Sequence, residues 1–180
     1  MEYCPGLVIG AEMPADLAKS WQGDRPIGAH ICDNLISVLV KLHALDPSAV
    51  GLDTLGQPAD FAARSLCGWT KRAFLAWEDD LPASVRGVLE WLSENIPDSS
   101  ECTLIHNDFK LDNVILDEAT LTPRAVIDWD MGTRGHPLYD LSVFLSYWTE
   151  KDDPPAMQDL RQMPTAEHGF PTREAAAAHY

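Results

Sequence analysis

The chain has 180 residues and a formal net charge of −15, because 28 Asp and Glu residues outnumber 13 Lys and Arg residues. This length suits a single domain, and a hydrophobic fraction of 46% is ordinary for a globular protein with a buried core. The acidic balance argues against nucleic-acid binding, which needs clustered Lys and Arg.

Membrane insertion and a structural disulfide or zinc site are also excluded by the sequence pattern. No apolar run approaches the roughly 20 residues of a membrane-spanning helix, and residues 1–6 are not typical of a signal peptide. The cysteines form no Cys-x-x-Cys pair, so we expect reduced thiols at Cys4, Cys32, Cys67 and Cys102. We therefore expect a cytoplasmic protein that binds neither membranes nor nucleic acid.

The first part of the chain predicts helices. Residues 16–21 are expected to form a short helix or a lid segment. Residues 26–45 predict a long helix that Pro47 follows, because apolar residues recur there at helical spacing. The residues on this apolar face are Ile31, Leu35, Val38, Leu39 and Leu42. His43, near the end of this helix, is interpreted as a structural imidazole.

Two further helices are predicted before the central motif. Residues 59–78 carry large side chains that we expect to pack in the core or against another lobe: Phe61, Leu66, Trp69, Phe74 and Trp77. Pro82 and Ser84 mark the start of the next helix, which has apolar residues at helical spacing at Val85, Val88, Leu89 and Leu92.

Short apolar strands frame a polar loop in the middle of the chain. The strands are predicted at residues 102–106, 114–116 and 125–128, and the loop runs from His106 to Asn113. A loop held between two buried strands is rigid, and rigid loops are suited to aiming catalytic groups.

The polar residues of this region are spaced as in kinases. Asp108 is followed five residues later by Asn113, and the next strand ends in Asp128. Phosphoryl transfer needs a carboxylate that takes the proton of the acceptor hydroxyl, and oxygen ligands for Mg²⁺. The pattern predicts Asp108 as the base, Asn113 and Asp128 as magnesium ligands, and Lys110 as a contact to the transferred phosphate. Asp130 stays open between a second metal contact and a surface carboxylate.

The last third of the chain predicts two helices and irregular segments. Residues 139–148 form a predicted helix with buried Leu141, Phe144, Leu145 and Trp148. Residues 131–137 and 157–169 are expected to be irregular, and residues 150–155 to form an exposed loop. Thr172 is the predicted N-cap of a final helix.

The motifs at residues 106–113, 126–132 and 136–141 resemble those of the aminoglycoside phosphotransferase family. The likeness is closest to the branch whose domains also occur fused to acyl-CoA dehydrogenases. It implies an α+β, protein-kinase-like large (C-terminal) lobe, mainly helical with a small β-hairpin catalytic core. It also implies ATP or GTP as phosphate donor, Mg²⁺, and a small-molecule hydroxyl as acceptor. Lys110 departs from many antibiotic-modifying members, which weakens the expectation of an aminoglycoside acceptor.

The resemblance assigns roles to two more residues. Asp140 matches a buried aspartate that braces the catalytic loop in the family. His106 is expected to support catalysis as a brace of the same loop, because no partners at metal-ligand spacing accompany it.

Residues 1–10 resemble the hinge between the two lobes of these enzymes, where Glu2 and Tyr3 are expected to contact the nucleotide base. Because no glycine-rich phosphate loop occurs, we expect residues 11–180 to form the C-terminal lobe, truncated at its end, without the small N-terminal lobe. Such a lobe would expose apolar surface, self-associate and show weak kinase activity.

Two alternatives to a complete kinase remain at this stage. The chain could be a catalytically incomplete fragment or a noncatalytic binding module of the same fold. A metal-dependent hydrolase built on His106, Asp108 and Asp128 is less favoured, because it leaves Asn113 and Lys110 without a role.

Overall fold

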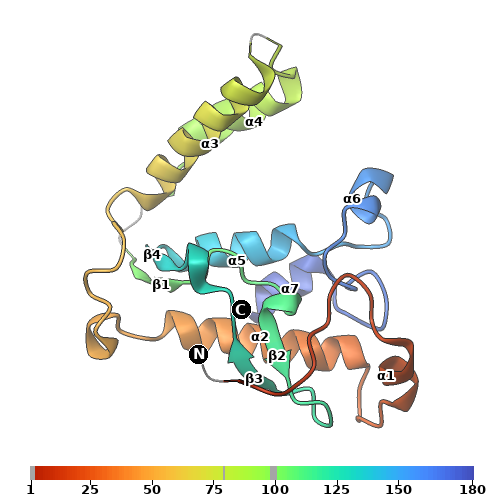
Figure 1. The fold of residues 1–180 in the computed structure, drawn as a ribbon. Helices are drawn as coiled ribbons and strands as arrows, with labels where there is room; N and C mark the ends of the chain where they lie inside the picture. Colours follow the sequence, from red (N-terminus) through yellow and green to blue (C-terminus); the bar gives the residue numbers. More distant parts are fainter. Residues whose placement is uncertain (1–2, 79, 98–100) are drawn as a thin grey trace.

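The computed structural model describes residues 3–78, 80–97 and 101–180, and it shows helices around two small sheets (Figure 1). The helices are α1 (Ala15–Ser20), α2 (Ile27–His43), α3 (Phe61–Trp77), α4 (Ala83–Glu94), α5 (Pro137–Ser146), α6 (Pro155–Asp159) and α7 (Arg173–His179). The strands are β1 (Thr103–Ile105), β2 (Val114–Leu116), β3 (Pro123–Val126) and β4 (Thr133–Gly135). Within the described ranges, no helix is both long and apolar enough to cross a membrane.

Two antiparallel pairs of strands hold the central loop. The β2–β3 hairpin, with Val114 opposite Val126, confirms the predicted hairpin. The second pair joins β1 to β4, with Thr103 opposite Gly135. Leu7 exchanges two backbone hydrogen bonds of 2.8 Å with Leu116, so the N-terminal segment lies along β2.

Strand β4 and helix α6 were not predicted from the sequence. Residues 131–137 were expected to be irregular, but pairing with β1 orders Thr133–Gly135 as a strand. A β-carbon on Gly135 would lie 2.7 Å from the Ile105 side chain and 3.1 Å from the Phe61 ring, so glycine at this position leaves room for these two side chains. Such short elements carry too little periodicity to be recognised without their tertiary partners.

Helix α2 runs through the centre of the core. Its predicted face is confirmed, since Ile31, Leu35 and Leu39 are fully buried, although Val38 is only partly so. Helix α5 and the residues after it supply fully buried Phe144 and Trp148, while Leu145 is partly buried. At the start of α7, the Thr172 hydroxyl accepts a hydrogen bond from the Ala175 amide, which confirms the predicted N-cap.

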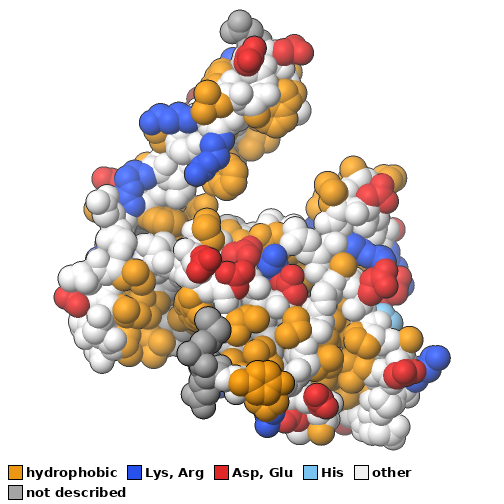
Figure 2. Space-filling model, in the orientation of Figure 1, with side chains coloured by type: hydrophobic (Ala, Val, Ile, Leu, Met, Phe, Trp, Pro, Cys, Tyr) orange, Lys and Arg blue, Asp and Glu red, His pale blue; other side chains and the backbone are white. Residues whose placement is uncertain are grey.

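The large side chains of the α3–α4 hairpin were predicted to pack in the core or against another lobe, and only the first is contradicted for most of its aromatic residues. Phe61 is buried, but Trp69, Phe74 and Trp77 are 58%, 44% and 46% exposed. The two helices pack on each other and project from the body of the molecule (Figure 1), with hydrophobic and basic side chains together on their surface (Figure 2). Helical spacing predicts an apolar stripe, but it does not say whether another element covers it. Self-association through such surface stays a prediction.

Core packing around Phe144 generates a stability prediction. Its ring lies 5.7 Å from that of Phe109 and 5.4 Å from that of Trp148. Phe144→Ala should lower the free energy of unfolding by about 3–5 kcal/mol, because it leaves a cavity among fully buried side chains. Urea denaturation measures this change. The control, Leu75→Ala, alters a residue that is 81% exposed and should change stability by less than about 0.5 kcal/mol. Similar losses in both variants would contradict this description of the core.

Candidate active site

Asp140 fixes the start of the central loop. This carboxylate is fully buried on the first turn of α5. Its Oδ2 atom accepts a 2.7 Å hydrogen bond from the His106 amide, and its Oδ1 atom accepts one of 2.7 Å from the Asn107 amide. The His43 Nε2 atom lies 3.2 Å from Oδ2. The loop therefore leaves β1 in a single backbone orientation.

His106 ties the same loop to the end of β3. The ring is fully buried, its Nε2 atom lies 2.9 Å from the Ile127 carbonyl, and its Nδ1 atom accepts from the Asp108 amide at 3.3 Å. A carbonyl oxygen can only accept, so the proton of the neutral ring is on Nε2. Because both nitrogens are occupied by backbone groups, His106 is placed to position the loop and not to transfer a proton.

Asp108 lies between three polar side chains at the edge of the loop. Its Oδ1 atom accepts a 2.5 Å hydrogen bond from the Tyr147 hydroxyl. Its Oδ2 atom accepts from the Asn113 amide at 3.2 Å and lies 3.6 Å from the Lys110 ammonium. Lys110 also lies 5.2 Å from the centre of the Tyr147 ring, so a cation–π contact helps to hold it.

Tyr147 was missed by the sequence reasoning. It falls inside the predicted helix 139–148, where helical spacing gives no sign of a contact with Asp108. Burial and the hydrogen bond to Asp108 raise the pKa of Tyr147 to about 12, which keeps the phenol protonated as a donor.

The structure brings Asn113 and the end of β3 together. The backbone carbonyl of Asn113 accepts a hydrogen bond of 2.9 Å from the backbone amide of Ile127, the residue that precedes Asp128. The Asn113 side-chain amide donates to the Asp108 backbone carbonyl at 2.9 Å, which turns its own oxygen away from that contact. Among the described residues, no donor engages the Asn113 Oδ1 atom or the Asp128 carboxylate.

Asp128 adopts a left-handed backbone conformation with φ of 62°. This conformation is uncommon for residues other than glycine, although Asp tolerates it better than most, and residues in it often occur at functional sites. The Asp128 side chain is exposed, as is that of Asp130 in the following turn. Both carboxylates are therefore accessible to a ligand.

The structure leaves the expected hinge contacts of Glu2 and Tyr3 untested. Glu2 lies outside the described residues. Tyr3 is 86% exposed, and in the described part of the chain it makes no hydrogen bond or ring contact with the central loop. The pairing of Leu7 with Leu116 places the following segment against the β2–β3 hairpin.

An open cavity of about 780 Å³ lies between the loop and α3. Asp108 and Tyr147 line one side, and Trp69 and Arg72 line the other. The Arg72 guanidinium lies 4.9 Å from the centre of the Trp69 ring. Arg64 also lines the cavity, but its guanidinium donates to the backbone carbonyls of the preceding loop.

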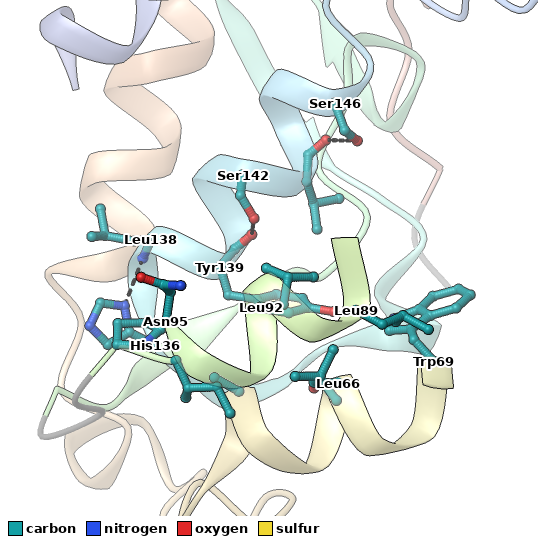
Figure 3. Close-up of a pocket in the computed structure, with 15 residues that line it drawn as sticks. Leu66, Trp69, Leu89, Leu92, Asn95, His136, Leu138, Tyr139, Ser142 and Ser146 are labelled. Atoms are coloured by element: carbon teal, nitrogen blue, oxygen red, sulfur yellow. Dashed lines mark hydrogen bonds between the residues drawn. The ribbon is translucent and has the colours of Figure 1, made fainter. Parts of the chain in front are cut away.

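A second, apolar cavity of about 490 Å³ lies beside the first, between the α3–α4 hairpin and α5 (Figure 3). Leu66, Leu89 and Leu92 from the hairpin contribute to its wall (Figure 3). The hydroxyls of Ser142 and Ser146 donate to carbonyls of their own helix, so they offer little to a ligand. The two cavities share the residues Ser65, Trp69, Tyr139, Val143 and Ser146.

The fold places this protein among the kinase-like phosphotransferases. A Ralstonia eutropha crystal structure, provisionally named an aminoglycoside phosphotransferase, matches with a TM-score of 0.77 and 25% identity, over 100% of this chain and 53% of its own. A type I macrolide 2′-phosphotransferase shares the fold at 18% identity with a TM-score of 0.61, over 98% of this chain and 60% of its own.

The chain belongs to the phosphotransferase enzyme family, known as APH, whose family model matches residues 1–179. It is 30% identical over 174 residues to acyl-CoA dehydrogenase family member 10 of Mus musculus, a match that covers 97% of this chain. It is 39% identical over 116 residues, 63% of this chain, to family member 11 of Rattus norvegicus. The matches span 16% and 15% of those two relatives.

The Tyr147–Asp108 hydrogen bond generates a titration prediction. The raised pKa means that the fold favours the neutral phenol, so the stabilisation is complete below the ordinary pKa of 10.0 and is lost as pH rises through about 12. Asp108→Asn removes the charge but not the burial, so the pKa of Tyr147 should fall toward 10.0. NMR of ¹³C-labelled tyrosine up to about pH 11, assigned with Tyr147→Phe, measures the shift. An unchanged titration in Asp108→Asn would contradict this contact.

Proposed function

We propose that this protein transfers the γ-phosphate of ATP or GTP to a hydroxyl group of a small molecule. In this proposal Asp108 is the base, Asn113 and Asp128 hold Mg²⁺, and Lys110 contacts the transferred phosphate. Glu2 and Tyr3 belong to the segment that would contact the nucleotide base. His106 and Asp140 position the loop.

One observation carries the proposal: the partly exposed Asp108 carboxylate faces a cavity large enough for a small molecule, next to Lys110 and Asn113. A base needs to reach the acceptor hydroxyl directly, and a cation beside it can neutralise developing phosphate charge. Membership of a phosphotransferase family supports the same reaction class.

The residues present fit a magnesium site. The Asn113 side-chain oxygen and the Asp128 carboxylate are hard oxygen donors, and Mg²⁺ prefers such ligands. In the described ranges, no group of three or more His, Cys, Asp or Glu residues is arranged to hold a metal. This pair would therefore share the ion with phosphate oxygens and water. When bound, Mg²⁺ neutralises charge on the phosphates and orients them.

The protein's own side chains would then perform the proton transfer. The acceptor hydroxyl gives its proton to Asp108 as its oxygen bonds to the γ-phosphorus, and the bond from that phosphorus to the nucleoside diphosphate breaks. Tyr147 occupies Oδ1, so Oδ2, on the side of Lys110, is the oxygen that we assign to this proton. The contacts of Oδ2 to Asn113 at 3.2 Å and to Lys110 at 3.6 Å are both longer than the 2.5 Å bond from Tyr147 to Oδ1, so Oδ2 is the less tightly held oxygen.

The two cavities suggest which acceptors suit this site. Arg72 lines the first cavity, and a cationic wall disfavours a polycationic acceptor. The adjoining cavity offers apolar walls to any part of the acceptor that extends beyond the reacting hydroxyl. We therefore propose an alcohol with an apolar portion as acceptor.

Nucleotide binding provides the first test. Calorimetry should show ATP binding that depends on Mg²⁺, and Asp128→Ala should weaken it at least about tenfold, because a metal ligand is lost. Asp108→Asn is the matched control, since it removes the proposed base but no metal ligand, and it should retain the affinity. Equal affinity in wild type and Asp128→Ala would contradict the metal assignment. Tight binding without any phosphate transfer would favour a noncatalytic binding module.

A homologous series of straight-chain alkanols tests the acceptor class. Each added methylene that enters the apolar cavity should lower the concentration for half-maximal ATP consumption about fourfold, because burying one methylene contributes about 0.8 kcal/mol. The variant Leu89→Asp places a charge in this cavity and should remove the dependence on chain length. A half-maximal concentration independent of chain length in the wild type would contradict the proposal.

A further inference from the structure

A polar chain connects Tyr180, directly after α7, to the catalytic loop. The Tyr180 hydroxyl lies 2.7 Å from the His43 Nδ1 atom, and their rings meet edge to face at 5.7 Å. The other nitrogen of His43, Nε2, lies 3.2 Å from the Asp140 carboxylate. Asp140 in turn holds the amides of His106 and Asn107. Four segments that are distant in sequence therefore meet in one hydrogen-bonded series.

Hydrogen-bond chemistry gives this series a direction. The Asp140 carboxylate can only accept, so the neutral His43 ring must carry its proton on Nε2. The Nδ1 atom then accepts, and Tyr180 must donate to it. The His43 side chain is only 5% exposed, so removal of the Tyr180 hydroxyl would leave a buried nitrogen without its donor.

Loss of that donor also affects the opposite side of the ring. Without Tyr180, the buried Nδ1 lone pair lacks a donor, and the ring would turn about its side-chain torsions to find one, which moves Nε2 away from the Asp140 carboxylate. Asp140 would then lose the His43 donor and shift from the position in which it holds both amides. The His43 backbone stays in place, since the Thr103 hydroxyl donates to its carbonyl at 2.7 Å, so the change is confined to the side chain.

We propose that Tyr180 is a positioning residue for the catalytic loop. Its hydroxyl donates to His43 Nδ1 and holds the ring in the orientation in which Nε2 donates to Asp140, and His43 thereby keeps Asp140 bonded to the His106 and Asn107 amides. Helix α7 then belongs to the machinery that orients Asp108, although it lines neither cavity described above. Only the catalytic role of the loop rests on the proposed function, because the hydrogen-bonded series exists with or without phosphate transfer.

Native-state hydrogen exchange of the His106 and Asn107 amides, followed by NMR, tests this proposal on the whole chain. Tyr180→Phe removes one hydroxyl and should accelerate exchange at both amides at least tenfold. The Leu116 amide, which donates to the Leu7 carbonyl, serves as the reference and should keep its rate. Tyr139→Phe is the matched control, because among the described residues the Tyr139 hydroxyl makes no hydrogen bond. His43→Ala should reproduce the effect of Tyr180→Phe.

Each outcome decides the matter. Selective acceleration at His106 and Asn107 in Tyr180→Phe, absent in Tyr139→Phe, supports the proposal. Unchanged exchange at the two amides overturns it. Equal acceleration at Leu116 also overturns it, because that result indicates a general loss of stability. Exchange needs no nucleotide, so a failure of the proposed function, seen as absent ATP binding, is distinguished from a failure of this inference.

Discussion

The structure depends on a buried negative charge at Asp140. A fully buried carboxylate is stable only when its oxygens are hydrogen-bonded, and here two backbone amides and one imidazole meet that need. Leaving a buried charged group without one of its hydrogen bonds costs on the order of 1–3 kcal/mol or more, so the arrangement tolerates little change. The amides that satisfy Asp140 belong to the loop that carries Asp108. The physical requirement of one buried charge therefore fixes the position of the proposed base.

The second requirement is to hold Asp108 ready without burying it. Its carboxylate remains partly exposed to the cavity, and Tyr147, Asn113 and Lys110 restrict its rotation. Tyr147 holds one carboxylate oxygen, and Asn113 and Lys110 approach the other, so rotation would break contacts at both oxygens. Preorganisation of this kind favours catalysis, because little reorganisation is needed when the acceptor arrives.

The core helices and the β2–β3 hairpin could be predicted because their signals are local. Residues such as Ile31, Leu35 and Leu39 recur at the period of a buried helix face. The polar residues of the loop have the spacing that phosphotransferases of the kinase type use. The contact of Tyr147 with Asp108 could not be predicted, because it depends on how α5 packs over the loop. The exposure of Trp69 and Trp77 could not be predicted either, because it also depends on how the helices pack. Periodicity describes one helix, whereas exposure depends on what lies opposite.

The central claim is that Asn113 and Asp128 hold a metal that presents a nucleotide to Asp108. A crystal structure with Mg²⁺ and a nonhydrolysable ATP analogue tests it most directly. The account predicts a metal ion about 2.0–2.1 Å from the Asn113 Oδ1 atom and from an Asp128 carboxylate oxygen, with the terminal phosphate on the side of Asp108. A nucleotide bound elsewhere, or a metal held by other residues, would contradict it.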